Sequence, residues 1–453
     1  MLIVRNPADG AVVGEHPETD PASLPALAGR ARVASRAWRR RPLKERLAVV
    51  GEFRARLKSE LEDLAGLLCD EVGKPISQAR GELKGTLGRL DWFLAESPAA
   101  LAPIDLGGEG TREEIRREPL GVIANISAWN YPWFVGSNVY VPALIAGNAV
   151  LYKPSELCAG SGLAVARLWR ESGLPEDLFT TLVGAGELGA ALLDAPIDAV
   201  FFTGSVATGR KINEAAARRL LKVQLELGGK DPAYVCDDVD PAKAAAAVAE
   251  GAFYNAGQSC CAIERVYVQR KIAEPFLAAL VKEVEAFKVG HPRAEDTFIG
   301  PMTREDGRRL VKRQIDAAVA DGARLLCGGD VIEGAGQFFQ PTVLADCTNA
   351  MAVFREESFG PVIGVAAVGD DAEAIRQMDD TSFGLTAAVF SSSEPRARAI
   401  LEELETGTAY WNCCDRVSPA LPWSGCRESG IGLTLSVEGI QTMTRPRAWH
   451  LRP

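Results

Sequence analysis

The sequence predicts an α/β protein with a doubly wound parallel sheet, and two observations carry this prediction. From Gly121 to Leu227, short apolar runs typical of strands alternate with helical patterns. After Gly229 a second alternating region begins, and it runs to about Gly425. Such alternation favours parallel strands whose carboxyl ends bind a nucleotide. We therefore expect two α/β domains, of which the first binds a nucleotide.

The expected elements of the first sheet alternate strictly. Strands are expected at residues 122–126, 149–152, 179–183, 199–203 and 222–227. The helices between them are expected at residues 132–146, 160–171, 187–194 and 207–220. Earlier in the chain, helical patterns at residues 21–39 and 43–71 are closed by Gly73-Lys74-Pro75. These patterns predict a helical layer before the sheet.

The domain division follows from these patterns. Residues 1–100 and 120–228 are expected to form the nucleotide-binding domain, and residues 229–432 the second domain. Residues 101–119, strand-like around 111–117, and residues 433–453 fit neither layer. One interpretation of these two segments is a surface hairpin and a frayed tail, because chain ends are often disordered.

Charge and hydropathy argue against two classes of partner. A net charge of −10 and a pI near 5.2 disfavour nucleic acid, because phosphate contacts need basic patches. The uncharged stretch 119–152 is long enough to suggest a membrane span. Its asparagines and internal prolines favour a buried strand, helix and strand instead, so no membrane partner is expected.

The first residues and the cysteines indicate the cellular compartment. Residues 1–7 lack the apolar core of a signal peptide, so we expect a cytoplasmic protein. The ten cysteines of the chain are then interpreted as reduced thiols. The adjacent cysteine pairs are not C-x-x-C and only three histidines could join them, so no metal site is expected.

A cysteine and a glutamate are the strongest candidates for chemistry. Cys260 follows the segment Asn255-Ala256-Gly257-Gln258-Ser259, and a nucleophilic thiolate needs a site that favours the anion. We expect Gly257 and Gln258 to form a turn that leads into a helix N-terminus, which supplies such a site. Glu226 ends an apolar alternating run before Gly228 and Gly229, where a strand end can aim a base.

These residues carry a resemblance to a known family. Asn-x-Gly-Gln-x-Cys ending at Cys260, with Glu226-Leu227-Gly228-Gly229-Lys230 upstream, resembles the aldehyde dehydrogenase superfamily of the NAD(P)-dependent, non-acylating type. Further blocks match in the same order, at residues 129–132, 354–361, 383–386, 422–425 and 429–430. The resemblance implies that residues 101–119 and 433–453 form a small β module that pairs subunits into a homodimer or homotetramer.

The resemblance implies a mechanism for oxidising an aldehyde. Cys260 is the nucleophile, Asn130 and the backbone N–H of Cys260 hold the oxyanion, and Glu226 activates the water that hydrolyses the thioester. Taken alone, Asn130 could instead cap the following helix. A bare Cys260-Cys261 pair is more often two small buried hydrophobes. None of the histidines lies in a motif-like segment, which disfavours a cysteine–histidine hydrolase.

Two other functions remain as alternatives. One is a coenzyme A-acylating aldehyde dehydrogenase, and Glu226 counts against it because acyl-transferring relatives generally lack this glutamate. The other is a catalytically silent structural or binding relative. Such chains usually lose the nucleophile or the base, whereas this chain keeps Cys260, Glu226 and Asn130.

The resemblance also implies a cofactor site, with NAD preferred and NADP as the alternative. Lys153 and Glu156 are expected on the adenosine ribose, where Glu156 would repel a 2′-phosphate. Gly184 begins a G-x-G-x-x-G turn near the adenine, although no acidic residue follows about 20 positions later as that fingerprint requires. Taken alone, the turn at Gly184 and the turn at Gly204 would each be ordinary strand-to-helix packing. The remaining expected contacts are Ile126, Trp129, Gly204, Ser205, Leu227, Glu357 and Phe359.

A substrate tunnel completes the implied site. It is expected to be lined by Tyr131, Phe134, Asn138, Ser259, Cys261, Asp415, Arg416, Val417 and Trp423. Asn138 and Val417 stand where bulky aromatic residues are common in the family, so we expect a roomier, more polar site. A small to medium polar aldehyde fits it, including a semialdehyde or an aminoaldehyde. Arg416 could meet a carboxylate and Asp415 an ammonium group, or either side chain could face away.

Overall fold

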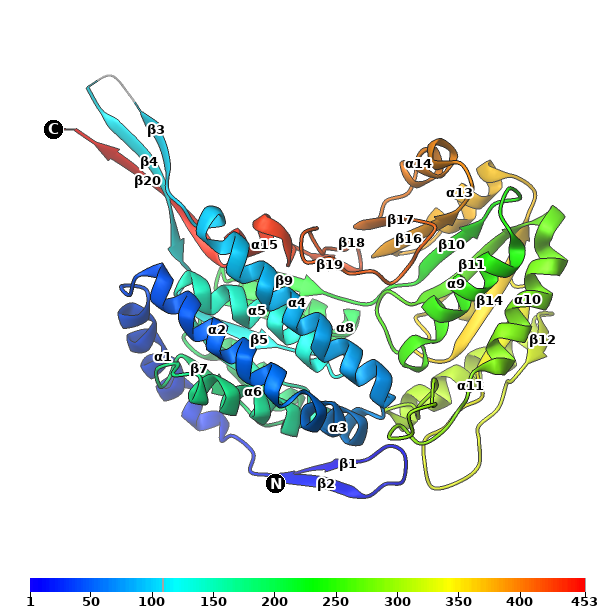
Figure 1. Cartoon of the computed structure of the whole chain (residues 1–453), viewed down its shortest axis with the longest axis horizontal. Helices are drawn as coiled ribbons and strands as arrows, with labels where there is room; N and C mark the ends of the chain where they lie inside the picture. The colour runs from blue at the N-terminus through cyan, green and yellow to red at the C-terminus, as the bar shows by residue number, and fades with distance from the viewer. Residues whose placement is uncertain (108–109, 453) are drawn as a thin grey trace.

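The computed structural model describes residues 1–107 and 110–452, and these residues form two lobes, each built on its own sheet (Figure 1). The predicted β module includes residues 108, 109 and 453, which lie outside the described residues. Each lobe has its own buried apolar core. The predicted division into domains stays a prediction.

The first sheet has the strand order β19-β9-β8-β5-β6-β7. Its strands are β5 (Val122–Ile126), β6 (Ala149–Lys153), β7 (Phe179–Thr181), β8 (Ala199–Thr203), β9 (Lys222–Glu226) and β19 (Gly430–Ile431). Neighbouring strands are parallel except for the antiparallel pair of β19 with β9. Strands β5 and β8 have the predicted bounds, and the other predicted strands differ by a few residues.

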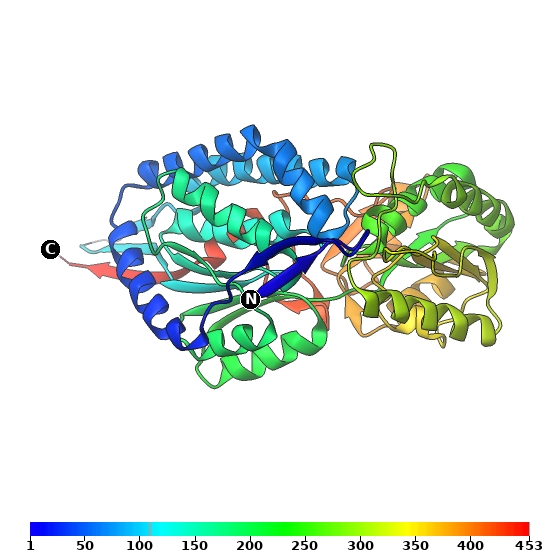
Figure 2. The same cartoon turned by 90° about the horizontal axis from the view of Figure 1, so that it is seen from below.

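Helices cover both faces of this sheet. They are α1 (Leu24–Trp38), α2 (Leu43–Ser59), α3 (Leu61–Val72), α4 (Ile76–Ala100), α5 (Pro132–Ala146), α6 (Ala159–Glu171), α7 (Gly186–Asp194), α8 (Val206–Ala217), α15 (Ser436–Thr442) and the 3₁₀ turns η1 (Pro21–Ser23) and η2 (Glu156–Cys158). Figure 2 shows α7 and α8 in green on one face, and α2 and α4 in blue on the other. The doubly wound fold is confirmed.

One helix prediction is wrong. Residues 43–71 form two helices, α2 and α3, because Glu60 leaves the helical backbone with φ −105° and ψ 13°. The bend directs α3 toward the second lobe (Figure 1). Gly73 ends α3 in the left-handed conformation, as the Gly-Lys-Pro signal predicts.

Helix α5 lies buried against β5, β6 and α4. The uncharged stretch 119–152 is therefore a buried strand, helix and strand, as predicted. Within residues 1–107 and 110–452, the structure contains no helix that is both long and apolar enough to span a membrane.

The second sheet has the strand order β12-β13-β14-β11-β10-β16-β17 and is parallel except for β12. Its strands are β10 (Asp231–Val235), β11 (Ile263–Gln269), β12 (Arg324–Cys327), β13 (Thr342–Ala345), β14 (Val362–Val368), β16 (Thr386–Phe390) and β17 (Thr408–Trp411). Its helices are α9 (Pro241–Phe253), α10 (Ala273–Ala286), α11 (Glu305–Ala320), α12 (Ala352–Arg355), α13 (Asp371–Asp379), α14 (Glu394–Leu401) and the 3₁₀ turns η3 (Tyr254–Gly257) and η4 (Arg270–Ile272). A second α/β region is thus confirmed.

A separate sheet projects from the first lobe (Figure 1). It consists of β3 (Ile104–Gly107), β4 (Arg112–Pro119) and β20 (Thr444–Leu451), in the order β20-β4-β3. Strand β20 pairs with β4 along its whole length, so the interpretation of the tail as frayed is wrong. The short pairs β1 (Leu2–Arg5) with β2 (Val12–His16), and β15 (Phe383–Gly384) with β18 (Cys426–Arg427), complete the strands.

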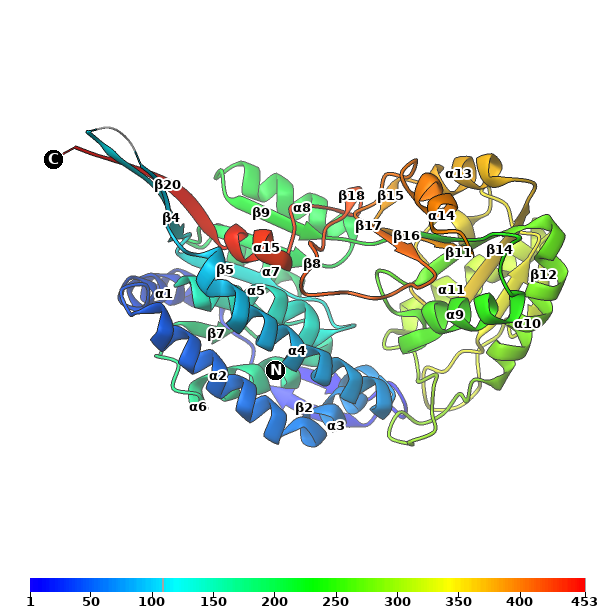
Figure 3. The ribbon, with the colours of Figure 1, turned by 45° about the horizontal axis from the view of Figure 1, so that its top comes forward.

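The chain crosses between the lobes after β9 and again after β17 (Figure 3). In the first sheet, Ile126 pairs with Lys153 on one side and with Phe202 on the other, and Thr203 pairs with Glu226. The carboxyl ends of four parallel strands therefore lie along one edge of the sheet. A parallel sheet binds its ligand at this edge.

Candidate active site

The backbone before Cys260 is strained. Asn255 and Ala256 both have φ 55°, and Gly257 has φ 71°, so three consecutive residues are left-handed. A Cβ on Gly257 would lie 2.2 Å from the carbonyl oxygen of Gly360. The predicted helix N-terminus is wrong, because left-handed backbone cannot continue a helix and the buried strand β11 follows. Strain of this kind is characteristic of functional sites.

Hydrogen bonds tie this turn to both lobes. The Gln258 side-chain oxygen accepts from the Thr303 backbone N–H at 2.9 Å, in the second lobe. The Gln258 carbonyl oxygen accepts from Asn130 Nδ2 at 3.2 Å, in the first lobe, and from Asn255 Nδ2 at 3.1 Å. Buried polar groups that are fully paired in this way fix a single backbone conformation.

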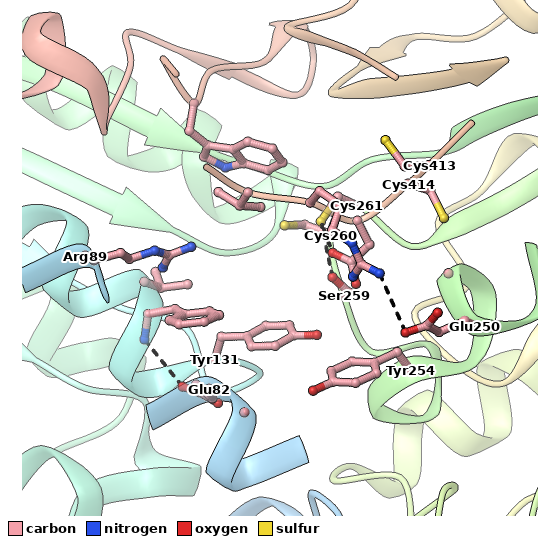
Figure 4. A pocket seen from close by; sticks show the side chains of 18 of the residues that line it. Glu82, Arg89, Tyr131, Glu250, Tyr254, Ser259, Cys260, Cys261, Cys413 and Cys414 are labelled. Atoms are coloured by element: carbon pink, nitrogen blue, oxygen red, sulfur yellow. Dashed lines mark hydrogen bonds and ion pairs between the residues drawn. The ribbon is translucent and has the colours of Figure 1, made fainter. Parts of the chain in front are cut away.

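Two cavities meet at Cys260. The larger, about 520 Å³, lies between α4, α5, α9 and the segment 412–423 (Figure 4). The smaller, about 280 Å³, lies at the carboxyl edge of the first sheet and reaches Gly204, Leu227 and Phe359. Cys260 lines both cavities. One thiol can therefore face a molecule in each cavity at the same time.

Cys260 and Cys261 have different surroundings. Cys260 is half-buried, whereas Cys261 is buried and its thiol donates to Asp415 Oδ1 at 2.9 Å. The neighbouring Cys260 thiol, burial and the Asp415 carboxylate together raise the pKa of Cys261 well above its ordinary value. Cys261 is therefore held as a neutral thiol, which is a poor nucleophile.

Asn130 contacts the turn rather than the helix that follows it. Tyr131 is the N-cap of α5, and the cap makes no side-chain hydrogen bond. The Asn130 side chain is buried and donates to Gln258, as described above, while lining the smaller cavity with Cys260. An amide nitrogen carries two hydrogens, so one donor remains for a ligand oxygen.

A buried ion pair supports the Asn130 loop. Lys74 and Glu82 pair with both side chains 0% exposed. Lys74 Nζ also donates to the Asn130 carbonyl oxygen at 2.7 Å, and it lies 3.7 Å from the centre of the Tyr131 ring. Glu82 Oε1 accepts from the Trp133 backbone N–H at 2.8 Å, at the first turn of α5. The pair thus joins α4 to the loop that carries Asn130.

Glu226 is buried at the end of β9. Its Oε1 accepts from Gln224 Nε2 at 2.7 Å and from Thr434 Oγ1 at 3.3 Å. Its Oε2 has no hydrogen-bond partner among the described residues. Burial raises the pKa of Glu226 well above its ordinary value. In the part of the chain that the structure describes, Glu226 is not among the residues that line either cavity around Cys260.

The smaller cavity brings together part of the predicted cofactor site. Six of the predicted contacts line it: Trp129, Gly204, Ser205, Leu227, Glu357 and Phe359. The Trp129 and Phe359 rings meet edge to face at 5.5 Å. Burial raises the pKa of Glu357 to about 7, and its Oε1 accepts from the Gly229 backbone N–H at 3.1 Å. The two aromatic rings and the Glu357 carboxyl group fit a ligand that carries a flat ring and hydroxyl groups.

The other predicted cofactor contacts lie beyond this cavity. Its lining within the described chain does not include Ile126, Lys153, Glu156 or Gly184. They lie instead at the ends of β5, β6 and β7, on the same edge of the sheet. Lys153 is buried, and its Nζ lies 3.9 Å from Glu156 Oε2. Ser205, which lines the smaller cavity, is the N-cap of α8 and accepts from the Thr208 backbone N–H at 3.3 Å.

All nine predicted substrate contacts line the larger cavity. The Asp415 carboxylate accepts a hydrogen bond from the Cys261 thiol, and burial raises the pKa of Asp415 to about 6. Arg416 lies 3.8 Å from Glu250 and its side chain is 66% exposed, so it stands at the rim. That these residues bind substrate stays a prediction.

Comparison with known proteins identifies this architecture. A family model described as "Aldehyde dehydrogenase family" matches residues 2–449. The chain belongs to the aldehyde dehydrogenase family. It is therefore an NAD(P)-dependent oxidoreductase that acts on an aldehyde, and the predicted family, fold and enzyme class are confirmed.

Named relatives and solved structures agree with this assignment. The enzyme is 34% identical over 443 residues to a succinate-semialdehyde dehydrogenase [NADP(+)] of Deinococcus radiodurans, covering 98% of this chain and 93% of the relative. It is 38% identical over 452 residues to betaine aldehyde dehydrogenase 1 of Rhizobium meliloti, covering 97% and 91%. An NAD-dependent aldehyde dehydrogenase from Sinorhizobium meliloti superposes with TM-score 0.96 at 34% identity, covering 99% and 90%. Lactaldehyde dehydrogenase from Escherichia coli gives TM-score 0.96 at 31% identity, covering 100% and 95%.

Sequence reasoning missed several positioning residues of this enzyme. Besides Lys74 and Glu82, a second buried pair joins Lys230 to Glu264. Glu264 accepts from the backbone N–H groups of Ser358 and Phe359, each at 2.8 Å, and so orients the block that contains Glu357. Lys230 belongs to the motif that contains Glu226, and this position in the motif could have indicated that Lys230 supports the site.

The Lys74–Glu82 pair generates a stability prediction. Lys74→Met leaves the Glu82 carboxylate buried without its partner, so we expect it to lower the free energy of unfolding by about 3–5 kcal/mol. Denaturation in urea, followed by fluorescence, measures this change. Glu295→Gln, which breaks the ion pair between the exposed Glu295 and Arg80 of α4, should leave the midpoint nearly unchanged. Equal midpoints for the two variants would contradict a supporting role for the buried pair.

Proposed function

We propose that this enzyme oxidises an aldehyde to the carboxylic acid through a thioester on Cys260, with NAD as its preferred cofactor. The observation that carries the proposal is that Cys260 lines both cavities. A thiol in this position can hold the aldehyde carbon next to a hydride acceptor. NAD, when bound in the smaller cavity, accepts that hydride.

The first half of the proposed reaction uses Cys260 and Asn130. The Cys260 thiolate attacks the aldehyde carbon, and a carbon–sulfur bond forms while the carbonyl oxygen becomes an oxyanion. Asn130 Nδ2 donates its second hydrogen to that oxyanion, together with the backbone N–H of Cys260. The oxyanion collapses as the hydride departs, and a thioester remains on Cys260.

The second half uses Glu226. Its carboxylate takes a proton from water, the hydroxide attacks the thioester, and the acid departs as the Cys260 thiolate re-forms. Burial raises the pKa of Glu226 above its ordinary value, which makes the carboxylate a stronger proton acceptor and supports this role. The unpartnered Oε2 supports it further, since this oxygen has no competing hydrogen bond among the described residues. Glu226 also favours hydrolysis over transfer to coenzyme A, and the three catalytic groups disfavour a silent relative.

We propose Lys153 and Glu156 as the groups that hold the adenosine ribose. The half-exposed Glu156 carboxylate can accept from both ribose hydroxyls, whereas a 2′-phosphate would be repelled. The capped N-terminus of α8 at Ser205 offers backbone N–H groups to a phosphate. Gly184 and Ile126 would lie beside the adenine. This arrangement favours NAD over NADP.

We propose a small to medium polar aldehyde as the substrate, and a homodimer or homotetramer as the assembly. A cavity of about 520 Å³ with charged groups in its wall supports the substrate class. The projecting sheet of β3, β4 and β20 supports the assembly, because β3 has no further strand beside it among the described residues and its Ile104 and Leu106 are exposed. A cytoplasmic location is supported by the ten free cysteines among the described residues.

The nucleophile is tested by alanine substitution. Cys260→Ala should abolish NADH formation, because it removes the covalent intermediate. Cys261→Ala is the matched control and should retain substantial activity. Absorbance of NADH with a panel of aldehydes measures both. Equal losses of activity in the two variants, with both folded, would contradict the assignment of Cys260 as the nucleophile.

The base is tested by Glu226→Gln. We expect a burst of about one NADH per active site and then a very slow steady state, because acylation needs no deacylating base. In the wild type, steady-state turnover should fall as the pH drops below the raised pKa of Glu226, since the protonated acid cannot take a proton from water. Stopped-flow absorbance measures the burst. A variant with no burst and unchanged turnover would make Glu226 a structural carboxylate.

The cofactor preference is tested by Glu156→Ser. The wild type should prefer NAD, and the variant should gain kcat/KM for NADP while losing about ten-fold or more for NAD, because charge-assisted hydrogen bonds are lost. Glu176→Ser removes the same charge from the loop before β7, at the opposite edge of the sheet, and should leave the ratio of the two cofactors unchanged. A wild type that already prefers NADP would overturn the ribose clamp.

The assembly is tested by sedimentation. The wild type should sediment as a dimer or tetramer, and Leu106→Lys should weaken the association by placing a charge on the exposed β3 strand. Val33→Lys is the control, because Val33 is an exposed apolar residue on α1, away from the projecting sheet. A monomeric wild type would contradict the proposed assembly.

A further inference from the structure

Arg89 is an arginine buried in the wall of the larger cavity. It lies on α4 and is 4% exposed. Its guanidinium lies over the Phe134 ring, 3.7 Å from the ring centre, and Figure 4 shows it reaching from α4 toward the interior of the cavity. Arg89 Nη1 has no hydrogen-bond partner, and no ion pair to Arg89 occurs within residues 1–107 and 110–452. A buried positive charge therefore lines the cavity without an ion pair among the described residues.

The acidic groups around the cavity are already engaged. Glu82, two helical turns before Arg89, is bound to Lys74 and to the first turn of α5. Glu250 stands near Arg416, and the Asp415 carboxylate accepts the Cys261 thiol. Arg89 is the cation that lacks such a partner in the described wall of this cavity.

The contact with Phe134 does not account for burying this charge. A desolvated cation over an aromatic ring recovers only part of the free energy that burying an unpaired ion costs. Burial lowers the pKa of Arg89 to about 10, so the guanidinium stays charged at neutral pH. A fold that keeps such a group usually uses it for binding, because buried charges are otherwise paired.

We propose that Arg89 binds a carboxylate at the far end of the substrate, so that the preferred substrate is an ω-oxo acid, an aldehyde that carries a carboxylate at its other end. This inference rests on the proposed oxidation at Cys260. The planar guanidinium fork matches a carboxylate with two parallel hydrogen bonds. In Figure 4, Cys260 lies between Arg89 on one side of the cavity and Glu250 on the other. A substrate whose aldehyde is at Cys260 can thus direct its other end to Arg89.

Arg89 suits this role better than Arg416, the arginine that the sequence singled out. The Arg416 side chain is mostly exposed and stands near Glu250, so its charge is screened by water and partly balanced. The Arg89 charge is shielded from water and unbalanced, and electrostatic attraction is stronger in such surroundings. The fixed ring beneath it also holds the guanidinium plane in one orientation.

The test compares matched pairs of aldehydes. Straight-chain alkanals and ω-oxo acids of about four to eight carbons are assayed for kcat/KM with NAD, together with the corresponding ω-aminoaldehydes. The wild type should favour the ω-oxo acid over the alkanal of the best-fitting length by about ten-fold or more, as expected for a charge-assisted pair. Arg89→Met should remove this preference by lowering kcat/KM for the ω-oxo acid about ten-fold more than for the alkanal. Arg89→Lys, which keeps the charge but not the fork, should retain part of the preference.

Arg80→Met is the matched control for Arg89→Met. Arg80→Met removes a guanidinium from the exposed face of the same helix, where Arg80 pairs with Glu62 and Glu295, and should leave the preference unchanged. If Arg89→Met lowers all three aldehyde classes equally, Arg89 is a structural residue. If the wild type prefers the alkanal or the aminoaldehyde, the proposed carboxylate site is wrong. If no aldehyde yields NADH, the proposed oxidation fails, and the role of Arg89 fails with it.

Discussion

The left-handed turn at residues 255–257 is the constraint on which the candidate site depends. It brings Gly257 so close to the Gly360 carbonyl that a side chain would not fit. Gln258 then bonds to Asn130 in the first lobe and to Thr303 in the second. Because the turn is held from both sides, Cys260 is fixed where the two cavities meet. The strain of the turn is thus offset by contacts that also position the thiol.

Much of the fold could be predicted from sequence. Apolar runs and helical periodicity locate β5, β8 and α5, because buried parallel strands and the helices that cover them have distinct patterns. The break at Glu60 could not be predicted, since glutamate is a good helix former. The residues alone did not show the pairing of β20 with β4, because strands so distant in sequence carry no local signal of each other, whereas the family resemblance implied a β module from these two segments.

The candidate site was predictable only in part. The motifs located Cys260, Asn130 and the lining of both cavities, since short motifs mark the turns and strand ends where chemistry occurs. The burial of Arg89 could not be predicted, because the sequence does not distinguish a buried arginine of a helix from one on its solvated face. The hydrogen bonds that hold the Glu226 carboxylate come from Gln224 and from Thr434, which is far along the chain. Long-range contacts of this kind need the folded structure.

The central claim is that Cys260 alone forms the covalent intermediate between the two cavities. The most direct measurement is the mass of the acyl-enzyme that accumulates when Glu226→Gln reacts with NAD and an aldehyde and is quenched with acid. The account predicts a peptide heavier by the aldehyde minus two hydrogen atoms, with fragmentation placing the acyl group on Cys260 and no adduct when NAD is omitted. An acyl group on Cys261, or NADH formed without any acylated peptide, would contradict it.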